Sequence, residues 1–333
     1  MKIALDAMGG DFAPLETVKG AVEAIEQIPN LEVVLVGHKD KIEAELKKYK
    51  YNSKKIEIIH TEEMILMKEE LPPATIVRKK KNASMNIALN LVKDGYCQGS
   101  VSAGNTGALL SASQIILKRI KGVLRPAITT VFPSKSGNMV MLDVGANADC
   151  KAEYLNQFAI MGSEFSRLIL DIKNPRVGLM NIGEEPGKGN ELVKETYDLM
   201  RENKDINFVG NVETRDMFEN VDVMVADGFT GNIVLKTSEG VAKFMVDILK
   251  EGIKAKLIRK IAALILKPVF NILKNKLDSS AYGGAIFLGL NGISIKAHGN
   301  SNARAIKNAL KVANKFAERN FVEELKRVIQ REA

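Results

Sequence analysis

The sequence predicts an α/β fold: a three-layer α/β/α sandwich with a mainly parallel sheet and a projecting helical hairpin. Short β-branched and apolar runs alternate with longer segments of helical periodicity, and small glycine-bearing polar segments follow several of the runs. This alternation is typical of parallel strands whose connecting helices cover both faces of a sheet. An amphipathic, lysine-rich segment near the middle of the second half predicts the hairpin.

The elements are expected in the following order. Strands are predicted at residues 2–6, 31–37, 56–60, 98–102, 128–132, 139–143, 176–182, 206–209 and 221–227. Helices are predicted at 14–27, 82–93, 106–118, 152–170 and 191–202, and one or two more at 302–329. No internal repeat or Gly-, Pro- or Ser-rich linker divides the chain. We therefore expect a single large domain over 1–333, with a helical excursion at about 233–281.

Composition excludes several classes of protein. The 333 residues are 46% hydrophobic and 26% charged, which are ordinary values for a globular protein. The longest apolar run, residues 261–266, is far shorter than the roughly 20 residues that span a bilayer. Asp6 interrupts the apolar stretch at the start, so we predict no secretory signal and a cytoplasmic protein. Cys97 and Cys150 lie too far apart for a CxxC metal or redox site.

The formal net charge of +8 suggests an anionic partner. Much of the excess lies between Asp247 and Asp278, where basic residues outnumber acidic ones. A nucleic-acid partner is disfavoured, because this segment holds only one aromatic residue, Phe270, on which bases could stack.

Small polar loops that contain glycine follow the strands, and they carry the strongest chemical signal. In an open α/β sheet, ligands bind outside the carboxyl ends of the strands, so we expect five such loops to meet at one cleft. Glycine allows a close approach of the backbone, and helix N-termini favour an anion such as phosphate. The five loops lie at 6–11, 102–107, 143–147, 181–190 and 227–232.

Particular residues of these loops are predicted to bind substrate. We expect Lys188 to supply a cation near a bound phosphate, and Asn147 and Asn232 to donate hydrogen bonds. His298 is the only histidine in a glycine-bearing polar loop and is a further candidate. The remaining candidates line the phosphate cradle: Asp6, Gly9, Gly10, Asp11, Gly104, Asn105, Thr106, Gly107, Asp227 and Gly231. The aspartates among them suit helix capping better than metal binding, so no metal or cofactor is predicted.

Several common catalytic motifs are missing. The sequence has no GxGxxG after the first strand, no GxxxxGK[ST], no GxSxG and no HExxH. These absences disfavour a nucleoside triphosphatase, a dinucleotide-dependent oxidoreductase and a serine hydrolase.

At the loops the sequence closely resembles the bacterial acyl-acyl carrier protein:phosphate acyltransferase family, PlsX. The motifs are DAMGGD at 6–11, SAGNTGA at 102–108, RPA at 125–127, DVGAN at 143–147, NIGEE with KGNE at 181–191, ADGFTGN at 226–232 and HGNS at 298–301. The resemblance implies a homodimer that converts acyl-acyl carrier protein and inorganic phosphate to acyl phosphate and free carrier protein in phospholipid synthesis. The closest alternative is a short-chain phosphotransacetylase or phosphotransbutyrylase that uses coenzyme A.

The basic segment is expected to bring the dimer onto a membrane surface. Leu249, Ile253 and Leu257 recur at helical spacing while lysines lie off that line, and Pro268 predicts a break between two arms. Association would be peripheral, on the inner face of the cell membrane, where a membrane-bound glycerol-phosphate acyltransferase would be a partner. The predicted membrane contacts lie at the tip: Leu264, Ile265, Leu266, Val269 and Phe270.

Overall fold

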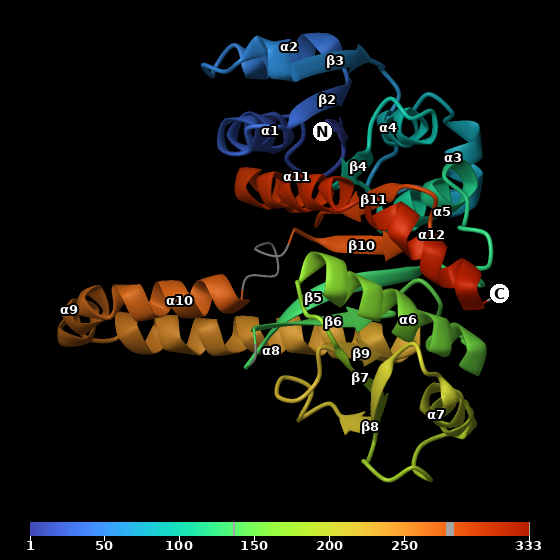
Figure 1. Ribbon diagram of the computed structural model, residues 1–333. Helices are drawn as coiled ribbons and strands as arrows, with labels where there is room; N and C mark the ends of the chain where they lie inside the picture. Colours follow the sequence, from blue (N-terminus) through green and yellow to red (C-terminus); the bar gives the residue numbers. More distant parts are fainter. Residues whose placement is uncertain (136, 278–282, 333) are drawn as a thin grey trace.

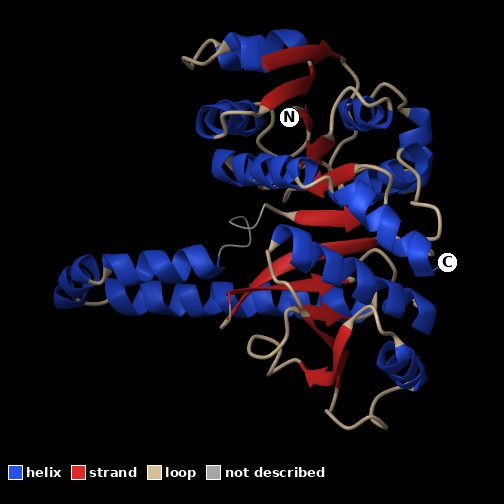
Figure 2. Cartoon of the chain, in the orientation of Figure 1, coloured by secondary structure: helices blue, strands red, loops and turns tan. Residues whose placement is uncertain are grey.

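A single eleven-stranded sheet organises the chain (Figures 1 and 2). The computed structural model describes residues 1–135, 137–277 and 283–332. The strands are β1 (Lys2–Asp6), β2 (Glu32–Gly37), β3 (Ile56–His60), β4 (Gly99–Ser102), β5 (Ala127–Ser134), β6 (Gly137–Leu142), β7 (Arg176–Asn181), β8 (Asn207–Glu213), β9 (Val223–Val225), β10 (Ala285–Leu288) and β11 (Ile293–Lys296). Their order across the sheet is β3-β2-β1-β4-β11-β10-β5-β6-β9-β7-β8.

Helices cover both faces of the sheet. They are α1 (Leu15–Gln27), α2 (Lys39–Leu46), α3 (Pro73–Lys79), α4 (Ser84–Lys93), α5 (Thr106–Ile116), α6 (Ala152–Ile169), α7 (Glu191–Glu202), α8 (Gly228–Lys254), α9 (Leu257–Ile265), α10 (Lys267–Leu277), α11 (Ala303–Glu318) and α12 (Phe321–Glu332), with a short 3₁₀ turn at Ser53–Lys55. Helices α1, α6, α11 and α12 share one apolar core, and α3, α4 and α5 share another on the opposite face. The predicted sandwich is therefore confirmed.

The sheet consists of two parallel halves that run in opposite directions. Strands β3, β2, β1, β4 and β11 are parallel to one another, and so are β6, β9, β7 and β8. Antiparallel pairing of β10 with β11 and with β5, and of β5 with β6, joins the halves. The sheet is thus mainly parallel, as predicted, with an antiparallel centre.

The two halves are staggered, so that their carboxyl ends meet. One continuous row of paired residues crosses the sheet: Val101, Ile295, Ile286, Thr129, Leu142 and Val225. Strands β4 and β11 of the first half end one residue beyond this row, whereas β6 and β9 of the second half end on it, coming from the other side. The loops that follow strands in both halves therefore open at the same place, although the strands point in opposite directions.

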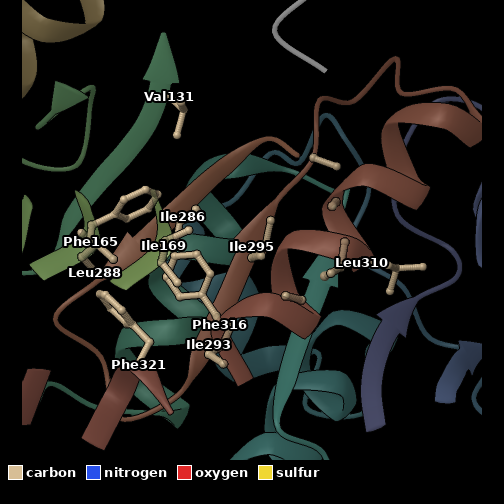
Figure 3. Close-up of a cluster of buried hydrophobic side chains, with 14 of the residues drawn as sticks. Val131, Phe165, Ile169, Ile286, Leu288, Ile293, Ile295, Leu310, Phe316 and Phe321 are labelled. Carbon is tan, nitrogen blue, oxygen red and sulfur yellow. The ribbon is translucent and has the colours of Figure 1, made fainter. Parts of the chain in front are cut away.

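Three phenylalanine rings pack where the halves join (Figure 3). Phe165 of α6, Phe316 of α11 and Phe321 of α12 have ring centroids 4.7 to 6.3 Å apart in tilted or edge-to-face contacts. They lie with Ile286 and Leu288 of β10 in the same buried cluster. Each such aromatic pair contributes roughly 0.5 to 1.5 kcal/mol beyond the burial of its surface. This cluster fixes the centre of the sheet, on which the geometry of both loop sets depends.

Two central strands, β10 and β11, were not predicted from the sequence. Each is only four residues long, and each lies close to glycine residues, so its periodicity is too short to stand out. The helices α2 and α3 are likewise additional to the predicted set.

The projecting hairpin is confirmed, with one correction to its tip. Helix α8 forms the first arm, α10 returns beside it, and α9 is a separate short helix at the far end (Figure 1). The break predicted at Pro268 is confirmed to within two residues: the chain turns at Leu266, and Pro268 lies in the first turn of α10. Proline is tolerated there because the first helical N–H groups have no partner within the helix. The correction is a further turn at residues 255–256, which ends the first arm and makes α9 a separate helix. The end of the predicted excursion, at residues 278–281, lies outside the described residues.

Candidate functional site

A cavity of about 290 Å³ opens at the row where the two half-sheets end. Thr106, Lys296 and His298 reach it from the first half of the sheet. Gly145 and the start of α8 line it from the second half, with Asn232, Lys236 and Glu239 among the α8 residues. Two of the five predicted loops, at 143–147 and 227–232, thus meet the one at 102–107 across the cavity.

Lys296 is the most buried cation of the cavity. Lys296 is only 7% exposed. Its Nζ donates to the carbonyl oxygen of Ala297 and, at 3.5 Å, to the carbonyl oxygen of Ala103. Burial lowers the pKa of this ammonium to about 8, against the opposing attraction of Asp11 and Asp6. Lys296 was not predicted from the sequence, because a lysine at the end of an apolar strand usually points to solvent.

A second cation, Lys236, lies on the α8 side of the cavity. Its Nζ is 2.8 Å from Oε2 of Glu239, and Nε2 of His298 is 3.5 Å from the other carboxylate oxygen. Bonding to His298 and Lys236 lowers the pKa of Glu239 to about 2 despite partial burial. Glu239 is therefore a carboxylate at neutral pH, and it holds the two basic groups at the mouth of the cavity.

Helix α5 points its N-terminus at the same cavity. Asn105 is the N-cap, and its side-chain oxygen accepts from the N–H of Ala108 at 2.9 Å, while its amide nitrogen donates to the carbonyl of Met67. Thr106, the first helical residue, lines the cavity. Two lysines, a helix N-terminus and the Thr106 hydroxyl outweigh the single carboxylate of Glu239, so the cavity is suited to an anion.

Asp6 organises the loops of the first half. It is 2% exposed and accepts from the hydroxyls of Ser84 and Ser102, each at 2.6 Å. Burial raises the pKa of this carboxyl, while the two serine hydroxyls oppose the change. Gly9 is required beside it, since a Cβ there would lie 2.5 Å from Oδ2 of Asp6. Asp6 thus contributes to the site by shaping the loop.

The rest of the loop at 6–11 packs against the loop that carries His298. The N–H of Asp11 donates to the carbonyl of Gly299 at 2.8 Å, and Gly10 has a positive φ of 104°. Gly104 and Gly107 lie in the neighbouring loop and first turn of α5. None of Asp6, Gly9, Gly10, Asp11, Gly104 or Gly107 lines the cavity itself, so their direct contact with substrate stays a prediction.

Asp143 plays the corresponding part in the second half. Its fully buried carboxylate accepts from the backbone N–H groups of Ile128, Gly145, Ala146 and Asn147, at 2.7 to 3.1 Å. The side-chain nitrogen of Asn147 donates to Asp143 and to the carbonyl of Pro126. Both amide hydrogens of Asn147 are therefore engaged within the protein. In this arrangement it supports the loop, and its predicted contact with substrate is untested.

Asp227 and Gly231 place the start of α8 against this loop. Asp227 is the N-cap and accepts from the N–H of Thr230 at 2.8 Å, which confirms the predicted capping role. A Cβ on Gly231 would lie 1.9 Å from the carbonyl oxygen of Asp143. Asn232 follows and faces the cavity, and its amide makes no hydrogen bond to the described part of the chain. It is the predicted donor that remains available to a ligand.

The loop at 181–190 lies apart from the cavity lining. The side chain of Lys188 is 54% exposed, and its Nζ is 3.9 Å from Glu185. The loop is closed by Asn181, whose amide donates to the carbonyl of Lys188 at 3.1 Å. The structure does not bring Lys188 among the cavity residues, and its catalytic role stays a prediction.

The predicted membrane contacts lie on the far end of the hairpin. Leu264 is 71% and Ile265 is 77% exposed, and Leu266 and Val269 are also exposed. Phe270 differs, since it is half-buried between α8 and α10. No helix in the described ranges is long and apolar enough to cross a bilayer. Among the same residues, no cluster of three or more His, Cys, Asp or Glu side chains could hold a metal ion.

Solved structures of similar fold include phosphotransacetylases and 4-hydroxythreonine-4-phosphate dehydrogenases. A phosphotransacetylase from Streptococcus pyogenes superposes with a TM-score of 0.64 at 20% identity, over 96% of this chain and 94% of that one. A 4-hydroxythreonine-4-phosphate dehydrogenase from Klebsiella pneumoniae gives a TM-score of 0.57 at 15% identity, over 95% and 99%. At these identities the likeness concerns the fold alone.

Sequence relatives are far closer. A phosphate acyltransferase from Fusobacterium nucleatum subsp. nucleatum is 57% identical over 99% of both chains. One from Dictyoglomus turgidum is 52% identical over 95% of this chain and 94% of its own. The family profile described as "Fatty acid synthesis protein" matches residues 1–324. The chain therefore belongs to the PlsX family of phosphate acyltransferases, within the fatty acid synthesis proteins, as its loop motifs predicted.

Proposed function

We propose that this enzyme transfers the acyl group of acyl-acyl carrier protein to inorganic phosphate in the cavity between the half-sheets. The observation that carries this proposal is the convergence of Lys296, Lys236 and the N-terminus of α5 on one small cavity. Such a site fits a doubly charged tetrahedral anion, and family membership supports the acyl donor.

The reaction needs no covalent intermediate with the protein. An oxygen of phosphate attacks the thioester carbonyl, the C–S bond of the resulting tetrahedral adduct breaks, and the carrier thiolate leaves and takes up a proton. Holding phosphate against the carbonyl contributes up to about 7 to 11 kcal/mol through orientation. A donor aimed at the developing oxyanion, for which Asn232 is our candidate because it lines the cavity, adds about 3 to 4 kcal/mol. Lys296 and Lys236 hold the phosphate dianion, so that one of its oxygens can approach the electrophilic carbonyl carbon of the thioester.

Dimer formation is part of the proposal. Helix α8 exposes an apolar stripe at helical spacing, formed by Val241, Phe244, Met245 and Ile248, which are 51 to 65% exposed. Two copies that pack along this stripe would bury it. Contiguous apolar patches on the surface of a protein usually mark a contact surface of this kind.

Membrane attachment would place the product where it is used. The exposed side chains of Leu264 and Ile265 enter the interface, and the lysines of the hairpin face anionic headgroups. Each buried large apolar side chain contributes about 1.5 to 3 kcal/mol and each cation about 1 kcal/mol. Acyl phosphate, an amphiphile, would pass from there to a membrane-bound glycerol-phosphate acyltransferase.

The product assay tests the proposed function. Purified enzyme is incubated with phosphate and either palmitoyl-acyl carrier protein or palmitoyl-coenzyme A, and acyl phosphate is trapped with hydroxylamine as the hydroxamate. We expect phosphate-dependent hydroxamate with the carrier-protein substrate at a kcat/KM well above that with coenzyme A. A preference for the coenzyme A ester would instead support the phosphotransacetylase alternative.

A further inference from the structure

A second, larger cavity of about 740 Å³ lies along the hairpin. It is a groove between α8 and α10, which run side by side (Figure 1). The groove shares Glu239 and His298 with the cavity of about 290 Å³ that Lys296 lines. A ligand whose reactive end occupies the first cavity can therefore extend directly into the second.

One apolar stripe runs along the groove, and polar side chains line the rest of it. Ala242, Val246, Leu249 and Ile253 recur every three or four residues, so they form one stripe of α8, and Phe270 and Leu273 of α10 face it. Lys243 and Lys250 also line the groove, and Nζ of Lys250 lies 3.5 Å from the Asp247 carboxylate. Long lysine side chains of this kind cover apolar surface with their stems while the charge stays in water.

We propose that this groove binds the acyl chain of the substrate. The proposal rests on the proposed function, because it assigns the chain of the same thioester whose carbonyl lies in the first cavity. The groove is open along one side, so a chain could enter from a carrier protein without threading through a tunnel. Its far end lies toward α9, so the bound chain points to the tip proposed to meet the membrane.

The length of the groove matches a long-chain fatty acid. From Glu239 to Ile253 the helix rises about 21 Å, at 1.5 Å per residue. An extended chain of sixteen carbons spans about 19 Å, from single bonds of about 1.5 Å and angles near 111°. Each position along the stripe therefore corresponds to a carbon number. Ala242 lies about 4.5 Å beyond Glu239, level with the fourth carbon, and Val246 lies about 10 Å beyond it, level with the eighth.

Two substitutions at different depths convert this correspondence into an experiment. Ala242→Phe and Val246→Phe each add bulk to the floor of the groove. Val241→Phe adds the same bulk outside the groove, on the stripe of α8 proposed for dimer contact. The kcat/KM of each enzyme is measured with butyryl-, octanoyl- and palmitoyl-acyl carrier protein at saturating phosphate. Sedimentation velocity records whether each variant keeps the oligomeric state of the parent.

The groove predicts a graded cut-off. Ala242→Phe should keep the parent kcat/KM with the butyryl substrate, and its kcat/KM with the octanoyl and palmitoyl substrates should fall about tenfold or more. Val246→Phe should show a fall of this size with the palmitoyl substrate only. Any effect of Val241→Phe should be the same for all three chain lengths. A loss that does not depend on chain length in the two groove variants would overturn the proposal, and if accompanied by dissociation would assign the groove to contact between copies. If the parent enzyme makes no acyl phosphate from any substrate, the proposed function fails instead.

Discussion

The carbonyl oxygen of Asp143 lies against Gly231, so close that a Cβ on this glycine would approach it to 1.9 Å. The contact joins the loop after β6 to the first turn of α8, and both segments line or support the anion cavity. Close packing within the protein therefore explains the glycine at 231. Because the start of α8 lies against this loop, Asn232 and Lys236 of α8 reach the cavity.

Replacement of this glycine should separate the two segments. Gly231→Ala is expected to lower the free energy of unfolding by about 2 kcal/mol or more and to reduce acyl transfer, because backbone must move to admit the methyl group. Gly240→Ala, farther along α8, is the matched control, since nothing lies within 4 Å of its added Cβ. It should stabilise the protein by up to about 1 kcal/mol through helix propensity. Urea denaturation measures both, and equal effects would contradict the packing argument.

Lys296 should make stability rise with pH. Burial lowers its pKa in the folded protein to about 8 from its ordinary 10.5. Between these values the unfolded chain holds more protons than the folded one, so the free energy of unfolding increases as pH rises. The full penalty, present below pH 8, is on the order of 3 kcal/mol. Urea denaturation at pH 7 and 9.5 should show a smaller rise in Lys296→Met than in the parent. An identical rise in both proteins would exclude a titrating Lys296.

The hairpin tip should govern membrane attachment and leave chemistry unchanged. Leu264→Glu with Ile265→Glu places two charges where the side chains are 71% and 77% exposed. The double variant should make acyl phosphate in solution at the parent rate but fail to co-sediment with vesicles that contain anionic lipid. The control Leu264→Phe with Ile265→Phe keeps an apolar tip and should still bind. Equal sedimentation of the Glu variant and the parent would disprove the assignment.

The main features of the fold could be predicted from local patterns, since strands such as β2 and β7 carry apolar runs and several of the loops that follow strands contain glycine. The reversal between the half-sheets could not, because it depends on β10 and β11, whose four-residue runs carry little periodicity. Loops from strands of opposite direction meet because the two half-sheets are staggered. This stagger is determined by strand pairing across the whole sheet, and no local sequence pattern encodes it.

The site was predicted in part for a similar reason. Asn232 and His298 could be identified from their loops, and both line the cavity. Lys296 and Lys236 could not, because the burial of a lysine depends on what packs around it. Asn147 was predicted to be an available donor from its loop. In the structure both of its amide hydrogens are engaged, by the carboxylate of Asp143 and the carbonyl of Pro126. In hindsight the position of Lys296 was suggestive, since it lies two residues before the HGNS loop.

The central claim is that phosphate binds beside Lys296, where the two half-sheets meet. The most direct test is the KM for inorganic phosphate in the parent, in Lys296→Met and in Lys296→Arg, at pH 7 with saturating palmitoyl-acyl carrier protein. We expect Lys296→Met to raise this KM about tenfold or more, since it removes a largely buried cation from the anion, while Lys296→Arg retains part of the affinity. A KM for phosphate that is the same in Lys296→Met and the parent would contradict the account.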